Sequence, residues 1–177
     1  KVAKFAPLST AKREERASEL APSLRGLAST DKTMLGHFSD DARVLEFLES
    51  SKMSKLAQLG TSCPDHFLRT KVKPLVLDTA PDADLEKVKK RLTELHEKYR
   101  AEYAAYYKKY AKKDSPAMRG ADPAIAMQPS VGMFSFGANK QTARVAGEFY
   151  LNAINVMRGA EALSEYKPIS DLEKFKI

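Results

Sequence analysis

The chain has 177 residues, of which 43% are hydrophobic and 30% are charged. This length and composition predict a soluble globular domain with a sizeable core, and they exclude a disordered chain. No apolar run is long enough to cross a bilayer and no signal-peptide pattern is visible, so we expect a cytoplasmic protein without a membrane partner. Cys63 is the only cysteine, which excludes an internal disulfide and fits a reducing compartment.

The net charge of +7 raises the question of an acidic partner. Lysine and arginine are spread along segments that also carry glutamate and aspartate, and no nucleic-acid-binding motif is present. We therefore expect a solvated, mildly basic surface and no nucleic-acid partner.

Residues 1–29 predict an extended start at Lys1–Leu8 and then a helix. Ser9 and Thr10 are candidate caps, and Glu14 suits the positive end of the helix dipole. Pro22 is expected to end or kink this helix. We interpret residues 1–29 as a linker helix that leads into the domain.

The following stretch alternates strands and helices. Lys32–Phe38 predicts a strand, and Ser39-Asp40-Asp41 then caps a helix. A second short helix follows Lys52 and ends at Gly60. Lys73–Asp78 predicts another strand, with Pro74 near its start, where a missing donor costs least. This order indicates an α/β arrangement.

The longest helix is expected after Pro81. Apolar and aromatic residues recur there in steps of three and four: Leu85, Val88, Leu92, Leu95, Tyr99, Tyr103, Tyr106 and Tyr110. We expect this stripe to pack along the domain or against a neighbouring subunit, since tyrosine suits a half-wet seam. A tyrosine platform for stacked bases is the alternative.

Residues 124–163 predict a β-hairpin followed by a helix. Ile125–Gln128 and Met133–Phe136 are short apolar runs, separated by the turn residues Pro129-Ser130-Val131-Gly132. The following residues place apolar or small side chains at helical spacing up to Ala160. On composition alone this is an ordinary hairpin-plus-helix packing unit.

Cys63 and His66 lie three residues apart, and both side chains can bind zinc. Zinc requires three or four protein ligands, and the remaining histidines are His37, in a turn, and His96, in a stretch expected to face solvent. A Cys–His nucleophile pair lacks an orienting third group. We expect neither a metal site nor a catalytic residue here.

The hairpin and helix resemble the C-terminal half of the class II aldolase/adducin fold. In active members the hairpin turn reads Asn-His-Gly and its histidine binds zinc; Ser130-Val131-Gly132 is the matching tripeptide. A His-x-His-Pro segment supplies two further ligands, and Thr61-Ser62-Cys63-Pro64 matches it with both histidines replaced. The family's catalytic glutamate has no match at Glu46 or Glu49, which we expect on a helix surface. The resemblance implies a three-layer α/β fold, with a mostly antiparallel central sheet between long helices, that has lost its zinc.

Three blocks also resemble the middle region of bifunctional rhamnulose-1-phosphate aldolase/short-chain dehydrogenase proteins: Gly60–Leu77, Asp114–Arg119 and Gly132–Leu163. The chain begins at Lys1 without a methionine and stops at Ile177 as a new segment begins, so we expect it to be a piece of a longer polypeptide, with an aldolase-like domain at residues 30–166 and the start of a linker at 167–177. In such proteins a zinc-dependent aldolase domain precedes this region and an NAD-dependent dehydrogenase domain follows it.

The segment itself has no glycine-rich dinucleotide-binding turn, so we expect no cofactor within it. The resemblance then implies a non-catalytic domain that packs against the neighbouring aldolase and dehydrogenase domains or builds a homo-oligomer. Two alternatives stay open. Arg69, Lys71 and Lys73 are candidates for a phosphate contact in a neighbouring aldolase site, against the simpler interpretation as a solvated basic edge. His66, Arg69 and Phe134 are candidates for a retained sugar-phosphate pocket.

Overall fold

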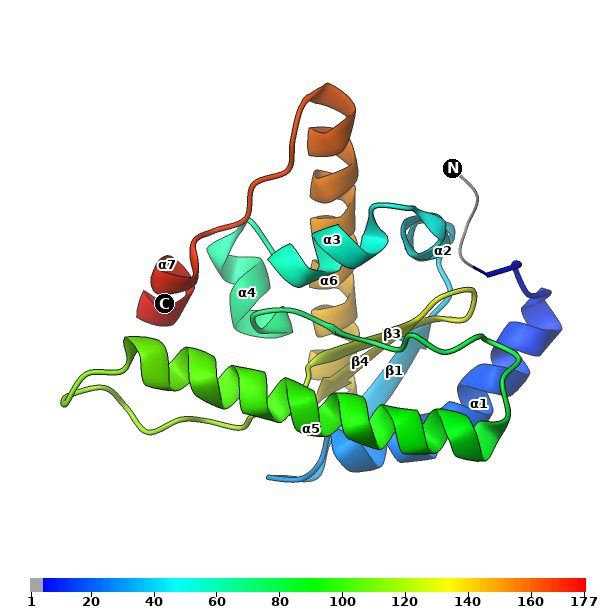
Figure 1. Cartoon of the computed structure of the whole chain (residues 1–177), viewed down its shortest axis with the longest axis horizontal. Helices are drawn as coiled ribbons and strands as arrows, with labels where there is room; N and C mark the ends of the chain where they lie inside the picture. The colour runs from blue at the N-terminus through cyan, green and yellow to red at the C-terminus, as the bar shows by residue number, and fades with distance from the viewer. Residues whose placement is uncertain (1–4) are drawn as a thin grey trace.

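A computed structural model describes residues 5–177, and Figure 1 shows helices packed around a small central sheet. The extended start expected for Lys1–Leu8 lies partly outside the described residues. The elements in chain order are α1 (Thr10–Leu27), β1 (Leu35–Ser39), α2 (Ala42–Glu49), α3 (Met53–Leu59), α4 (Pro64–Thr70), β2 (Leu75–Val76), α5 (Leu85–Tyr110), β3 (Ile125–Gln128), β4 (Gly132–Gly137), α6 (Lys140–Leu163) and α7 (Asp171–Lys176). The expected α/β class is confirmed.

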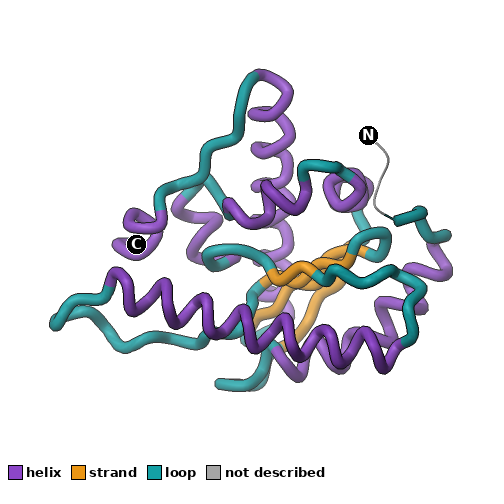
Figure 2. Tube along the Cα trace, in the orientation of Figure 1, coloured by secondary structure: helices purple, strands orange, loops and turns teal. Residues whose placement is uncertain are grey.

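The described strands form one mixed sheet in the order β1-β4-β3-β2. β4 pairs antiparallel with both β1 and β3, whereas β2 pairs parallel with β3. These strands lie near the centre of the molecule, drawn in orange in Figure 2. β2 is only two residues long, shorter than the strand expected over Lys73–Asp78, although the backbone N–H of Leu77 still donates to the carbonyl of Met127 at 2.8 Å.

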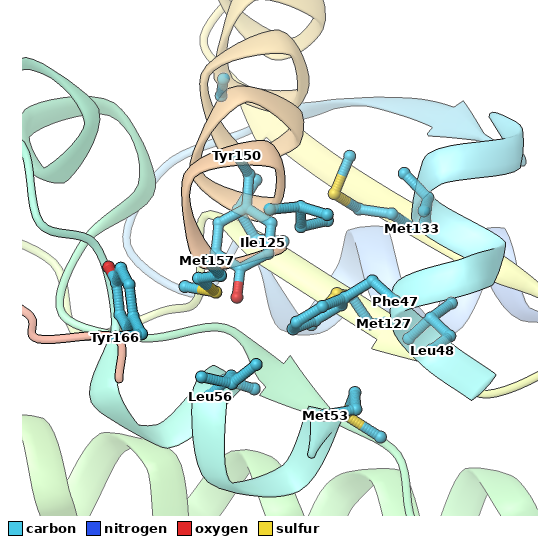
Figure 3. Close-up of a cluster of buried hydrophobic side chains, with 14 residues drawn as sticks. Phe47, Leu48, Met53, Leu56, Ile125, Met127, Met133, Tyr150, Met157 and Tyr166 are labelled. Carbon is cyan, nitrogen blue, oxygen red and sulfur yellow. The ribbon is translucent and has the colours of Figure 1, made fainter. Parts of the chain in front are cut away.

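Alternating side chains of the hairpin strands divide the core between the two faces of the sheet. Ile125, Met127 and Met133 join a cluster with apolar residues of α2, α3 and α6 (Figure 3). Ala126 and Phe134 join a second cluster with residues of α1 and α5. Helices therefore cover both faces of the sheet.

The hairpin-plus-helix unit expected at residues 124–163 is confirmed. Its turn contains Ser130, which has a left-handed φ of 61°, and Gly132, at a φ of 151°. A Cβ at Gly132 would lie 2.7 Å from the Phe38 ring, so only glycine lets β1 approach this closely. Asn139 then caps α6, because its Oδ1 accepts a hydrogen bond from the Thr142 backbone at 2.8 Å.

The long helix is confirmed as α5, capped by Asp84. Its first half packs against α1 and β2, whereas three tyrosines near its end contact α7. Phe175 of α7 lies 5.7 to 6.1 Å, between ring centroids, from Tyr106, Tyr107 and Tyr110. Residues 167–177, expected as the start of a linker, thus include a helix that packs on the domain.

Three local features differ from what the sequence predicted. Pro22 does not end α1, which continues to Leu27, because the buried Leu20 and Leu24 on either side of the proline hold the helix against the core. β1 begins at Leu35 and not at Lys32. His96 is buried, whereas its lysine- and glutamate-rich surroundings indicated a solvent-facing position.

The segment interpreted as a linker helix is a structural part of this fold. The cluster on the α5 side of the sheet buries three residues of α1, Ala17, Leu20 and Leu24, together with its C-cap residue Ala28.

Candidate functional site

The hairpin turn is the place where the family resemblance locates a zinc ligand. Val131 occupies that position, is fully buried, and belongs to the same apolar cluster as Leu77 and Phe134. A valine side chain has no lone pair for a metal. The donor set at this turn therefore does not fit zinc.

The second candidate ligand segment, residues 61–64, forms the start of α4. Thr61 is buried, and its hydroxyl donates to the Cys63 carbonyl at 3.4 Å. Cys63 is the N-cap residue and Pro64 opens the helix, where a missing backbone donor costs nothing. The chemistry of this segment is that of a helix start, and α4 itself was not expected from the sequence.

His66 lies on α4 against α6 and is buried. Its Nε2 is 3.1 Å from Nδ2 of Asn152, and since an amide nitrogen can only donate, the ring nitrogen accepts. Its ring meets Phe149 edge-on, with centroids 5.4 Å apart. Burial lowers the pKa of His66, and the charge of Asp65 opposes this effect only in part. These contacts describe a neutral, packed histidine.

His66 and Phe134, proposed from the sequence as two walls of one pocket, lie on different sides of the sheet. His66 contacts α6, whereas Phe134 belongs to the cluster with α1 and α5. The structure does not bring them together.

The three basic residues considered for a phosphate contact point to different partners. Nζ of Lys73 is bound by Glu102 at 2.6 Å and by Gln58 at 2.7 Å. Nζ of Lys71 turns inward to the carbonyls of Gly120 and Asp122. Arg69 is exposed on α4. The side chains of Lys71 and Lys73 are therefore engaged in internal contacts.

A polar cluster that the sequence did not indicate surrounds Asp122, a buried residue in the loop before β3. Its Oδ2 accepts from the hydroxyl and the backbone N–H of Thr30, at 2.6 and 2.9 Å. Its Oδ1 lies 3.0 Å from Nε2 of His96 and pairs with the guanidinium of Arg100. Four segments of the chain thus meet at one carboxylate and at the adjacent Lys71 amine.

The electrostatics of this cluster favour an ionised Asp122. Burial raises the pKa of the carboxyl, but hydrogen bonds from Thr30, Arg100 and His96 outweigh burial and lower it. The pKa of Lys71 is lowered by burial, which the negative charges of Asp122 and Asp31 only partly offset. Because its partners saturate the carboxylate, we interpret the cluster as a clasp that holds the loop before β3, and not as a reactive centre.

Sequence reasoning missed this cluster because its members are far apart in the chain and have no common spacing. His96 stands among the exposed Lys and Glu residues of α5, and Asp122 stands in a loop. Among residues 5–177, no group of three or more His, Cys, Asp and Glu side chains has the arrangement of a metal site.

The fold and the hairpin define an α/β domain in which an apolar side chain, Val131, occupies the turn between β3 and β4. A family model described as "Aldolase class II, second domain" matches residues 15–177. The chain therefore belongs to the class II aldolase second-domain family.

One curated relative is the "Uncharacterized oxidoreductase YuxG" of Bacillus subtilis (strain 168), which is 31% identical over 175 residues. The match covers 98% of the chain but only 25% of the relative, so the chain spans about a quarter of that protein's length. No solved structure matches the chain. In the described part of the chain, no helix combines the length and apolar character needed to span a membrane.

Proposed function

We propose that this chain is a non-catalytic, zinc-less aldolase domain that serves a structural role in a longer enzyme. The observation that carries the proposal is the burial of Val131, in the core, at the position that matches the family's hairpin histidine. A catalytic domain of this type needs a lone pair at this turn to hold the metal that stabilises the enediolate. In this chain the position contributes to packing.

The longer enzyme we propose is a cytoplasmic, bifunctional sugar-catabolic protein. Its aldolase domain would split rhamnulose 1-phosphate with zinc, and its dehydrogenase domain would oxidise the aldehyde product with NAD. The B. subtilis relative is named as an oxidoreductase, and this chain matches only a quarter of it. That name supports a redox domain elsewhere in the longer polypeptide. The helices on both faces of the sheet support the three-layer arrangement of class II aldolases.

The partners we propose are the neighbouring domains of the same polypeptide and further copies of the chain. The clasp at Asp122 supports a structural role, because it ties the segment after α1, the segment after α4, helix α5 and the loop before β3 into one fixed arrangement. A rigid domain of this kind can position other domains without chemistry of its own.

The test is the zinc content of the purified chain, measured together with cleavage of rhamnulose 1-phosphate before and after addition of zinc. We expect no stoichiometric zinc and no cleavage above background, beside an active class II aldolase as the positive control. About one zinc per chain with zinc-dependent cleavage would overturn the proposal. The variants Cys63→Ala and His66→Ala, with His37→Ala as their control, would then identify the ligands.

A further inference from the structure

The two edges of the sheet differ in how they are protected. At one edge, β2 is two residues long, follows Pro74 and contacts α5. At the other edge, β1 has five residues with the sequence Leu-Gly-His-Phe-Ser, which contains neither the lysine nor the proline that commonly blunts a free edge. Leu35 and Gly36 of β1 are exposed. β1 is therefore an edge strand that pairs with β4 alone among the described strands.

A groove of about 500 Å³ runs beside this edge, between β1 and α1. Its floor is apolar and includes Phe38, Phe134 and Phe136. Its α1 wall is one stripe of residues at helical spacing: Glu14, Ala17, Ser18, Ala21, Pro22 and Arg25. The two ends of the wall carry opposite charges, with Glu14 at one end and Arg25 at the other.

The polarity of α1 relative to β1 is fixed by two contacts. Near the start of α1, Arg13 pairs with Asp40, just after β1, at 3.2 Å. Near the end of α1, Nε of Arg25 donates to the carbonyl of Met34, just before β1, at 2.9 Å. Helix and strand therefore run antiparallel, so Glu14 stands beside the end of β1 and Arg25 beside its start.

We infer that a second copy of this chain docks at this edge, with its β1 antiparallel to the first β1 about a two-fold axis. In such an isologous contact the start of one β1 meets the end of the other. Glu14 of each copy then faces Arg25 of its partner, and the four-stranded sheets join into one continuous sheet. The inference rests on the proposed structural role and names the surface that performs it.

The lengths of the two elements agree with this arrangement. Glu14 and Arg25 lie eleven positions apart on the helix, which corresponds to roughly 16 Å. A five-residue strand spans roughly the same distance. The two charges thus bracket the strand, so that one register satisfies both the backbone pairing and the two ion pairs.

The self-complementary charge pattern is what favours a second copy over another occupant. An unrelated extended segment would need a basic residue opposite Glu14 and an acidic one opposite Arg25, whereas a two-fold axis supplies both from the chain itself. Glu14 is also exposed, and the hydrogen bond described for Arg25 leaves the rest of its guanidinium for a carboxylate.

The test is sedimentation equilibrium of the full 177-residue chain and of charge-reversed variants. We expect a dimer for the natural chain, and a dissociation constant raised about tenfold or more for Glu14→Arg and for Arg25→Glu, since each substitution turns two attractive pairs into repulsive ones. An equimolar mixture of the two variants should form a heterodimer tighter than either variant alone. This rescue shows that neither variant fails by misfolding.

The matched control is Glu15→Arg, which makes the same charge change on another face of α1, in the neighbourhood of Pro81 and Asp82. It should leave the dimer unchanged. Hydrogen exchange of the backbone amides of residues 35–39 should slow with increasing concentration in the natural chain.

A monomeric natural chain overturns the inference, as does a dimer that Glu14→Arg and Glu15→Arg weaken equally, or one without protection at residues 35–39. Capture of an extended peptide by a monomer would overturn it in favour of a different occupant. None of these outcomes alters the zinc and cleavage measurements, so failure of the dimer and failure of the proposed non-catalytic role are distinguishable.

Discussion

Asp122 and His96 are joined by a 3.0 Å contact between Oδ1 and Nε2, and both side chains are almost completely buried. The same carboxylate also binds Thr30 and Arg100. The contact joins the middle of α5 to the loop that leads into β3. A single side chain thus connects the long helix to the hairpin on which the whole domain is built.

We expect Asp122→Ala to destabilise the chain by about 3 kcal/mol, because it leaves the buried His96 ring and the half-buried Arg100 guanidinium without their anion. Urea unfolding followed by circular dichroism measures the change. Asp114→Ala is the matched control, since Asp114 is exposed in the loop after α5, and it should change stability by less than about 0.5 kcal/mol. Equal effects for the two variants would contradict the clasp interpretation.

His66 predicts a dependence of stability on pH. Its pKa is lowered in the folded state, so the unfolded state binds the proton more readily. The stability associated with a neutral His66 is therefore complete above the unfolded pKa of about 6.5, and it falls as the pH drops from there toward the lowered folded pKa.

The measurement is the free energy of unfolding between neutral and mildly acid pH, compared with that of His66→Gln. We expect the variant to lose part of the slope. Asp65→Asn should steepen the slope, because the Asp65 charge opposes the lowering of the pKa. A slope that neither substitution changes would show that another group titrates.

Restoring a histidine at the hairpin turn should not restore a metal site. We expect Val131→His to cost about 2 kcal/mol or more, because it places a larger, polar imidazole in a fully buried position of an apolar cluster. Zinc titration by calorimetry should show no specific binding. Val156→His is the matched control, since Val156 is 41% exposed on α6 and should tolerate the same change. Stoichiometric zinc in Val131→His alone would mean that the remaining ligands are present.

Two glycines of α6 should respond in opposite ways to alanine. A Cβ at Gly147 would lie 2.8 Å from Oγ of Ser135, which itself donates to the Ala143 carbonyl at 2.7 Å. Gly147→Ala should therefore displace the Ser135 hydroxyl from its hydrogen bond or shift α6 on β4, and destabilise the chain by about 1 to 3 kcal/mol.

A Cβ at Gly159 would have no packing neighbour within 4 Å. Gly159→Ala should therefore stabilise the chain by about 0.5 to 1 kcal/mol through helix propensity. Thermal unfolding of the two variants measures the difference. The same sign for both would show that the packing of α6 on β4 is looser than the distance indicates.

Local patterns of the chain were sufficient to predict its longest elements. The hairpin and α6 follow from turn residues between apolar runs and from helical spacing, and α5 follows from a stripe that continues for several turns. The family resemblance identified the class. Val131 could be singled out from the sequence because the identity of a single residue decides whether its side chain can bind a metal.

The remaining features depend on contacts between distant segments, which local patterns do not contain. The burial of His96 is accompanied by its contact with the Asp122 carboxylate. α1 continues through Pro22 because Leu20 and Leu24 pack against apolar residues of α5 and the sheet. The sequence offers Lys71 and Lys73 as a phosphate contact or as a solvated basic edge, yet their amines bind groups that lie far along the chain. α4 was missed because its seven residues include a proline and have no clear apolar period.

The pairing of β1 with β4 joins residues roughly one hundred positions apart, whereas β3, β4 and α6 are contiguous. Closing so large a loop costs entropy before the pairing returns any stability. We therefore expect the contiguous unit to form first during folding and β1 to join last. Until β1 joins, the edge of β4 is uncovered. A newly made chain is therefore most exposed to aggregation in the interval before β1 completes the sheet.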